Sequence, residues 1–210
     1  RAVMMAGAWD RDVLISAAFG VGDYDRGRFE AHGWGRLTYG PSYYAPSFFR
    51  DAAGRPAITL WMRGVDDLEA GWAGAHSVPH MLELDGDVLV ARPHPDLESY
   101  RAPAAVGGVV DGPAADVVWA GSGRLTITSG ERTLVTVDAR AGEIVIDVPE
   151  GAWSGTSSVP RSRDEVRVIV DAGSVEISTD RGLFGAGIPA PEHGLAVTGD
   201  GVTVFPLVRD

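Results

Sequence analysis

Residues 57–62 read Ala57-Ile58-Thr59-Leu60-Trp61-Met62, an apolar run with the length and composition of a buried β-strand. Similar runs follow at Gly142-Glu143-Ile144-Val145-Ile146-Asp147 and Val166-Arg167-Val168-Ile169-Val170. Turn signals separate such runs. The Asp-Gly pair in Leu84-Asp85-Gly86-Asp87-Val88 predicts a tight hairpin, and Gly199-Asp200-Gly201 predicts another near the end. This pattern indicates an all-β protein, either a sandwich or a propeller.

The composition narrows the classes of partner. The 210 residues carry a net charge of −11, from 29 acidic and 18 basic residues, and every one of those basic residues is Arg. Such a surface repels phosphate backbones, so we expect no nucleic-acid partner. Since no apolar run approaches the ~20 residues of a membrane helix, we expect no membrane partner. The absence of Cys excludes disulfides and thiolate metal sites, and it fits either a reducing or an oxidising compartment.

The sequence indicates one domain boundary. The run His94-Pro95-Asp96-Leu97-Glu98-Ser99-Tyr100-Arg101 predicts a short helical turn, with Pro95 at its first position and acidic residues behind it. A stretch of small residues rich in Gly follows at 102–108. We therefore predict a β domain over residues 1–93, a short helical linker over 94–104, and a second β domain over 105–210.

A series of short motifs runs through residues 39–101. In order, they are Tyr39-Gly40, Tyr44-Ala45-Pro46, Phe48-Phe49, Gly54-Arg55, Trp61-Met62, Gly71-Trp72-Ala73-Gly74, Ser77-Val78-Pro79, Leu82-Glu83-Leu84 and Arg101. In this order and at these intervals they resemble the later blades of the five-bladed propeller of glycoside hydrolase family 32, the fructosidases that include invertase, levanase and inulinase. The resemblance implies that residues 1–93 form the last blades of a propeller and residues 105–210 a β-sandwich.

The second half carries a partial match to the same family. Its sandwich signature runs from an apolar strand through Asp-Arg-Ser and two further residues to Glu, an apolar residue and an aromatic. Residues 166–177 resemble it, ending in Asp171, Ala172-Gly173, Ser174-Val175 and Glu176-Ile177. Ala172-Gly173 stands in place of Arg-Ser, and Ser178 in place of the aromatic residue.

The resemblance implies hydrolysis of β-fructofuranosidic bonds in sucrose or fructan, by a double displacement without metal or organic cofactor. That reaction needs two carboxyl groups about 5 Å apart, one as nucleophile and one as general acid and base. In the family these groups belong to Asn-Asp-Pro-Asn-Gly and Glu-Cys motifs, with an Arg-Asp-Pro motif between them, and none of the three occurs in this sequence. We therefore assign no catalytic residue. We expect the carboxy-terminal portion of an enzyme whose catalytic carboxylates lie in a missing amino-terminal part.

Two residues are candidates for the wall of a sugar pocket. Trp61 matches a family Trp that lies against the fructose ring, and Tyr44 matches a family Tyr that can offer its hydroxyl to the substrate. The alternative for Trp61 is a place in the core, because it lies within an apolar strand. Thr38 stands where many members have an Asp that shapes the aglycone side, which puts substrate preference in doubt.

Other constellations favour structural roles. His76 and His80 have the spacing of zinc ligands on a helix, but Pro79 and strand-like surroundings argue against a metal site. Asp171 and Glu176 predict hydrogen bonds at the surface or between domains rather than a second carboxylate dyad. Six Trp residues are more than average, and four of them lie in strand-like or motif positions, which predicts core packing first.

Two functions of another class remain open. One is a non-catalytic module that binds fructan or another sugar without cleaving it. The other is a structural half that pairs with a separate amino-terminal half to rebuild an enzyme. An open propeller leaves unpaired strands, so the second alternative predicts exposed apolar edges near residues 1–30.

Overall fold

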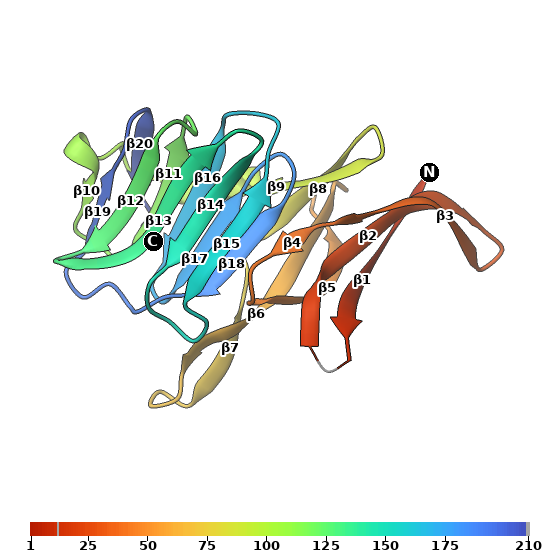
Figure 1. Ribbon diagram of the computed structural model, residues 1–210, viewed down its shortest axis with the longest axis horizontal. Coiled ribbons are helices and arrows are strands. Elements are labelled where there is room, and N and C mark those ends of the chain that lie inside the picture. The colour runs from red at the N-terminus through yellow and green to blue at the C-terminus, as the bar shows by residue number, and fades with distance from the viewer. Residues whose placement is uncertain (12, 209–210) are drawn as a thin grey trace.

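The computed structural model describes residues 1–11 and 13–208 (Figure 1). These residues form four β-sheets and two short 3-10 helices, so the predicted all-β class is confirmed. In Figure 1 the two sheets of the second half lie packed together at the left, and the two sheets of the first half extend to the right.

The first half consists of two antiparallel sheets. One has the order β1-β2-β3, with β1 (Ala2–Asp10), β2 (Val13–Asp25) and β3 (Arg28–Arg36). The other has the order β5-β6-β8-β9, with β7 also paired to β6. Its strands are β5 (Tyr43–Arg50), β6 (Pro56–Asp67), β7 (Trp72–His76), β8 (His80–Asp85) and β9 (Val88–Pro93). Phe19, Tyr43 and Leu60 are buried together in the core that these two sheets share. Small antiparallel sheets of this kind are the blades of a propeller.

The second half is a sandwich of two sheets. One has the order β10-β19-β12-β13-β14-β15, with β10 (Val109–Val110), β19 (Leu195–Thr198), β12 (Arg124–Ser129), β13 (Arg132–Arg140), β14 (Glu143–Val148) and β15 (Gly155–Pro160). The other has the order β20-β11-β16-β17-β18-β4, with β20 (Val202–Pro206), β11 (Ala114–Trp119), β16 (Val166–Asp171), β17 (Ser174–Ser178), β18 (Leu183–Gly187) and β4 (Thr38–Tyr39).

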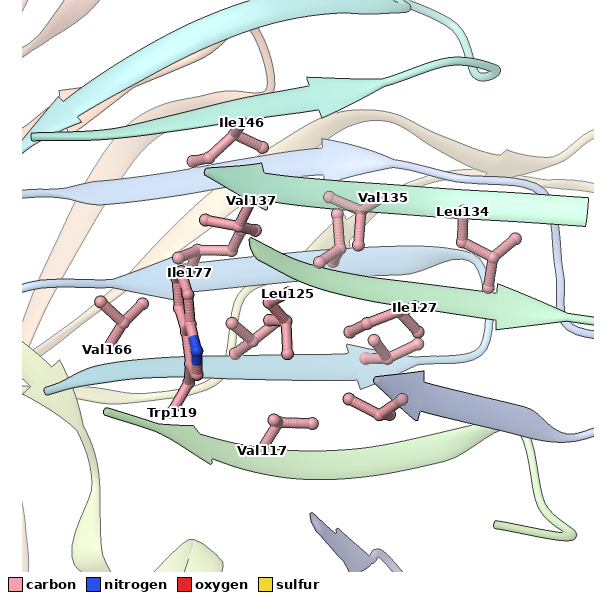
Figure 2. Close-up of a cluster of buried hydrophobic side chains, with 14 of the residues drawn as sticks. Val117, Trp119, Leu125, Ile127, Leu134, Val135, Val137, Ile146, Val166 and Ile177 are labelled. Atoms are coloured by element: carbon pink, nitrogen blue, oxygen red, sulfur yellow. The ribbon is translucent and has the colours of Figure 1, made fainter. Parts of the chain in front are cut away.

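Alternating apolar residues build the core of the sandwich. In β12, Leu125 and Ile127 are buried while Thr126 between them is half-buried, because successive side chains of a strand point to opposite faces. Figure 2 shows these side chains meeting those of the facing sheet around Trp119. The Trp119 indole is buried, and its N–H donates to the backbone oxygen of Asp200 at 3.1 Å. The buried aromatic ring therefore keeps a partner for its one polar atom.

A short strand from the first half completes the second sandwich sheet. β4 pairs in parallel with β18, matching Thr38 with Leu183 and Tyr39 with Phe184. Thr38 is buried, and its hydroxyl accepts the backbone N–H of Ala17 at 2.8 Å. A strand of the first half is therefore part of a sandwich sheet.

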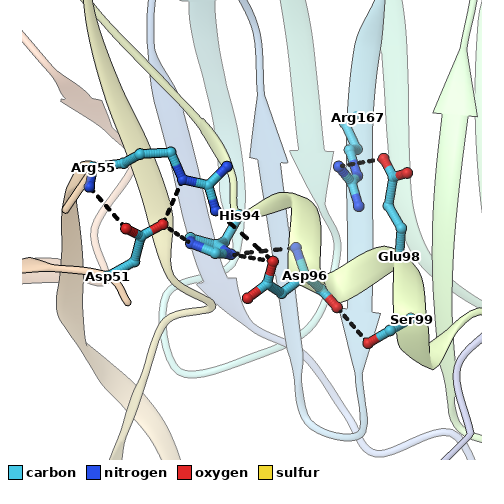
Figure 3. A network of polar contacts seen from close by, with 7 residues as sticks. All are labelled: Asp51, Arg55, His94, Asp96, Glu98, Ser99 and Arg167. Carbon is cyan, nitrogen blue, oxygen red and sulfur yellow. Dashed lines mark hydrogen bonds and ion pairs between the residues drawn. The ribbon is translucent and has the colours of Figure 1, made fainter. Parts of the chain in front are cut away.

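The linker begins with the 3-10 helix η1 (Pro95–Tyr100), where the sequence predicts a helical turn, and η2 (Val106–Gly108) follows. His94 caps η1: its Nδ1 accepts the N–H of Asp96 at 3.2 Å. The other ring nitrogen, Nε2, lies 3.2 Å from Asp51 Oδ2 and therefore carries the proton. Asp51 also binds the Arg55 backbone N–H and Nε at 2.7 and 2.5 Å (Figure 3). This network fixes the start of the linker to the end of β5.

A buried carboxylate holds the other end of the linker to the sandwich. Asp116 on β11 accepts from Arg101 Nε at 2.8 Å and from Arg167 Nε and Nη2 at 2.8 and 2.5 Å. Figure 3 shows Arg167 beside Glu98 of η1, at an N–O distance of 3.8 Å. Two guanidinium groups thus compensate the charge of a side chain that is 1% exposed.

Two turns differ from the sequence prediction. β8 and β9 do form a hairpin, but the register pairs Asp85 with Val88, so the central residues are Gly86 and Asp87. Gly86 supplies the positive φ, at 64°. The second predicted hairpin is wrong, because β19 and β20 lie in different sheets and residues 199–201 cross between them. Gly residues mark a tight turn, but they do not say whether the strands on either side pair.

Candidate functional site

Trp61 and Tyr44 lie side by side on one face of the sheet. They are direct partners in the register of β5 and β6, and their ring centroids are 5.9 Å apart at an interplanar angle of 48°. Trp61 is 42% exposed, so its alternative place in the core is wrong. Tyr44 is half-buried. Their roles in sugar binding stay a prediction.

A glycine on the neighbouring strand makes room for the Trp61 ring. Gly74 of β7 has φ +77°, and a Cβ on it would lie 2.0 Å from Trp61 Nε1. Because any side chain at that position would collide with the indole, the Gly71-Trp72-Ala73-Gly74 motif has a direct structural reason for ending in Gly.

Three further side chains extend this pair. The Trp9 ring of β1 meets Tyr44 edge to face at 5.4 Å. The Arg63 guanidinium carbon lies 5.7 Å from the Tyr44 ring centroid and 5.2 Å from that of Trp153. We call these five residues, Trp9, Tyr44, Trp61, Arg63 and Trp153, the aromatic cluster. Trp153 belongs to the loop between β14 and β15, so the second half of the chain contributes to it.

Backbone contacts hold Arg63 and Trp153 in place. Arg63 Nη2 donates to the Pro41 oxygen at 2.9 Å. Beside Arg63, Gly64 has φ +68°, and a Cβ there would lie 2.7 Å from the Trp153 ring. The loop carrying Trp153 therefore rests directly on the backbone of β6.

The prediction that the Trp residues fill the core is wrong for most of them. Trp119 is buried, whereas Trp9, Trp34, Trp61, Trp72 and Trp153 are 42–58% exposed. A Trp within an apolar strand is buried only if another layer covers its face of the sheet. In the described residues no such layer covers these five.

The cluster offers indole and phenol rings with one guanidinium. Aromatic faces stack on the apolar face of a sugar, and the phenol hydroxyl and the guanidinium can hydrogen-bond to its hydroxyls. Rings and a guanidinium supply neither a nucleophilic carboxylate nor a carboxylic acid, so these five residues can hold a sugar but cannot cleave it by double displacement.

A larger hollow of about 860 Å³ lies where β6 and β7 face the β16–β17 turn; Trp72, His76, Val78, Asp171 and Glu176 are among its lining residues. Glu176 is buried there. Its Oε2 accepts the Tyr43 hydroxyl at 2.5 Å and its Oε1 accepts the Val78 N–H at 2.9 Å. Burial raises the pKa of Glu176 to about 7, against the lowering effect of these two hydrogen bonds. Glu176 therefore makes the predicted contact between the two halves, while Asp171 is exposed.

The two histidines of the metal hypothesis have different surroundings. His76 on β7 is exposed, whereas His80 on β8 is buried, and desolvation lowers the pKa of His80 to about 3. In the described residues, no group of three or more His, Asp and Glu side chains is placed to hold a metal ion. Nor does that part of the chain contain a helix long and apolar enough to cross a membrane.

Sequence reasoning missed Trp9, Arg63 and Trp153. The signal for Trp153 was a lone large aromatic residue in the polar, Gly-containing loop Glu150-Gly151-Ala152-Trp153-Ser154-Gly155. A bulky ring in such a loop needs a surface to rest on. Trp9 and Arg63 have no comparable local signal.

A family model and curated proteins match the first half of the chain. The model described as "Glycosyl hydrolases family 32 N-terminal domain" matches residues 2–93. A fructan 1-exohydrolase of Bromus pictus is 42% identical over 74 residues, which are 32% of this chain and 12% of that protein. A β-fructofuranosidase, insoluble isoenzyme 4, of Oryza sativa subsp. japonica is 39% identical over 74 residues, with the same coverage of 32% and 12%.

Solved structures match nearly the whole chain. A β-fructofuranosidase variant from Bombyx mori in complex with sucrose superposes with a TM-score of 0.76 at 21% identity, over 92% of this chain and 47% of its own. Fructan 1-exohydrolase IIa from Cichorium intybus gives 0.66 at 16% identity, over 98% and 56%. The chain thus spans about half the length of these structures. The predicted fold, the last blades of a propeller followed by a β-sandwich, is confirmed. The chain is thus similar to members of glycoside hydrolase family 32, in sequence over residues 2–93 and in fold over nearly its whole length.

Proposed function

We propose that this chain is the carboxy-terminal portion of a β-fructofuranosidase that hydrolyses the β-fructosidic bonds of sucrose or fructan by a retaining mechanism. The nucleophile and the general acid and base come from an amino-terminal part of the enzyme. This portion supplies one wall of the sugar site, with Trp61 and Tyr44 as binding residues.

The pair of exposed Trp61 and half-buried Tyr44 carries the proposal. Trp61 is 42% exposed at a strand centre, and Gly74 leaves space for its ring; these two observations support a ligand-contacting role over a place in the core. The similarity to family 32 supplies the class of ligand, and fructan 1-exohydrolases are among the matched relatives.

The test compares this chain with the native protein isolated from its source. Intact mass measures the size of the native protein, and release of fructose from sucrose and inulin measures activity. We expect a native mass well above 22.1 kDa with fructose release, and no release from the 210-residue chain alone. Fructose release by the chain alone would show that its own carboxylates suffice, and inactivity of the native protein would overturn the proposal.

A second candidate is a non-catalytic module that binds fructan. The aromatic cluster favours it, because its five side chains can hold a sugar without cleaving it. Calorimetric titration of the isolated chain with inulin oligosaccharides tests this function. The module would be favoured over the enzyme if the native protein had about the mass of the 210-residue chain, bound inulin oligosaccharides and released no fructose.

A third candidate is a half-protein that needs a partner. The sheet β1-β2-β3 favours it, since exposed apolar residues occur on its strands, among them Val3, Met4 and Trp34. Analytical ultracentrifugation over a range of concentrations tests it. Self-association of the chain alone would agree with an uncovered sheet, and a strictly monomeric chain would count against it.

A further inference from the structure

A second, smaller hollow lies beside the aromatic cluster, where the loop between β14 and β15 approaches the end of β3 and residues 40–41. It has a volume of about 340 Å³. Its lining includes Arg36, Trp153, Ser154, Thr156, Ser157 and Phe184. We call it the loop hollow. Its volume lies at the lower end of the range of small-ligand pockets, which is about 300–1,000 Å³.

Direct contacts connect the loop hollow to Tyr44. Trp153 lines the hollow and also lies against Arg63, whose guanidinium carbon is 5.2 Å from its ring centroid. Arg63 in turn lies 5.7 Å from the Tyr44 ring and donates to the oxygen of Pro41, another lining residue of the hollow. The hollow and the predicted sugar-binding pair therefore share a single layer of packed side chains.

The lining combines three kinds of group. Trp153 is 42% exposed and offers an aromatic surface, and Ser154 and Ser157 offer hydroxyls. The hydroxyl of Thr156 donates to Asp147 Oδ1 at 3.0 Å and can still accept. The Arg36 Nε donates to the Thr38 backbone oxygen at 2.8 Å, and its guanidinium carbon lies 4.4 Å from the Tyr39 ring centroid. One ring, several hydroxyls and one cation suit a neutral polyol, which needs an apolar face to stack on and donors and acceptors around it. A single guanidinium in a chain of net charge −11 is a weak basis for binding an anion.

We propose that the loop hollow, where the sandwich half meets residues 36–41 of the first half, is a second sugar-binding site that takes a fructosyl unit of a fructan with Trp153 as its stacking residue. This inference rests on the proposed function, since it takes the ligand class from the pair Trp61 and Tyr44. It adds a binding residue on a different half of the chain and a preference for fructans longer than the one unit that this pair holds.

The test is calorimetric titration of the 210-residue chain with inulin oligosaccharides, for the wild type and for Trp153→Ala, Trp61→Ala and Trp72→Ala. Removal of one stacking ring should weaken binding about tenfold in Trp153→Ala. Trp72→Ala is the matched control, because Trp72 is 47% exposed but lines the larger hollow instead. It should bind as the wild type does.

A second variant guards against misfolding of Trp153→Ala. Ser154→Leu leaves Trp153 against Arg63 and puts bulk into the loop hollow from an exposed loop position. It should unfold at the wild-type denaturant concentration and still lose about tenfold in affinity. Wild-type affinity in this folded variant would overturn the inference.

The remaining outcomes separate the two proposals. Weakened binding in Trp61→Ala with wild-type binding in Trp153→Ala would overturn the second site alone. Weakened binding in Trp72→Ala alone would move the second site to the larger hollow and also overturn it. No binding of any oligosaccharide by the wild type would overturn both sugar sites. Binding of inorganic phosphate that Arg36→Leu abolishes and Trp153→Ala keeps would replace the sugar with an anion.

Discussion

Glu176 is the single residue whose ionisation most directly concerns the contact between the two halves. Burial raises its pKa from 4.5 to about 7, and its carboxyl group touches Tyr43 and Val78 of the first half. A carboxyl group with a raised pKa stabilises the folded state fully below its unfolded pKa. That contribution is lost as the pH rises through the folded pKa.

Glu176→Gln should therefore change how stability depends on pH. The free energy of unfolding of the variant, relative to wild type, should rise by about 3 kcal/mol between pH 4.5 and pH 7, because the variant has no charge to desolvate. Urea denaturation at a series of pH values measures this difference. His80, whose lowered pKa has the opposite effect on stability, is present in both proteins, so its effect cancels. A difference that stays constant across this range would contradict the assignment.

Truncation at two neighbouring positions on β6 should destabilise the protein to different extents. Leu60 is fully buried, so Leu60→Ala should lower the free energy of unfolding by about 2–5 kcal/mol. Trp61→Ala, on the exposed face, should cost less than about 1.5 kcal/mol even though it removes a larger side chain. Guanidinium denaturation of both variants measures the contrast, and equal losses would place Trp61 in the core after all.

For single residues, the sequence predicts those site residues that belong to a short local motif. Trp61 and Tyr44 stood out because family motifs include them. Arg63 and Trp153 did not, because their contact joins residues far apart in the chain, and no local pattern encodes such a pairing. Exposure was also beyond local pattern, since Trp61 and Trp119 both lie in apolar strands with opposite outcomes.

Among the secondary-structure elements, the linker should depend most on Asp116. Removing this buried carboxylate leaves Arg101 and Arg167 with only the exposed carboxylate of Glu98 nearby, so Asp116→Ala should cost about 3–5 kcal/mol. Asp138→Ala is the matched control, because Asp138 pairs with Arg124, which is 64% exposed, and such pairs contribute about 1 kcal/mol or less. Thermal unfolding followed by circular dichroism measures both. If Asp138→Ala destabilised the protein as much as Asp116→Ala does, burial of the carboxylate would not explain the effect of Asp116→Ala.

Strands with a strong local signal were predicted, and those defined by distant partners were not. β6, β14 and β16 follow from runs of apolar residues, and η1 follows from Pro95 at its first position with acidic residues behind it. β4 has only two residues, and its pairing with β18 follows from the way the halves meet. The same reason explains the wrong hairpin at residues 199–201: strand pairing is a tertiary property.

For the whole molecule, we expect the two halves to unfold together. Leu37, Tyr43 and Leu183 lie in one buried cluster, although Leu183 belongs to the sandwich half. Shared burial of this kind couples the stability of both halves. Differential scanning calorimetry of the 210-residue chain should give a single transition, with equal calorimetric and van't Hoff enthalpies. Two resolved transitions would show that the halves are independent.

The division into residues 1–93, 94–104 and 105–210 stays a prediction at this scale. Composition indicates a domain boundary at the linker. It carries no information about β4, a strand of the first half that pairs with the sandwich half. Such a crossing depends on where residues 38–39 arrive in space, which the neighbouring sequence does not encode.

The pairing of β4 with β18 constrains how this protein could have been assembled in evolution. A gene fusion or exchange that cut the chain at the linker would remove β4 and leave β18 as a bare edge of its sheet, and such an edge recruits other chains. A recombinant sandwich would have to bring a substitute for residues 38–39, or evolve charges along β18 to keep that edge unpaired. We therefore expect the short strand and the sandwich to be inherited together in related genes.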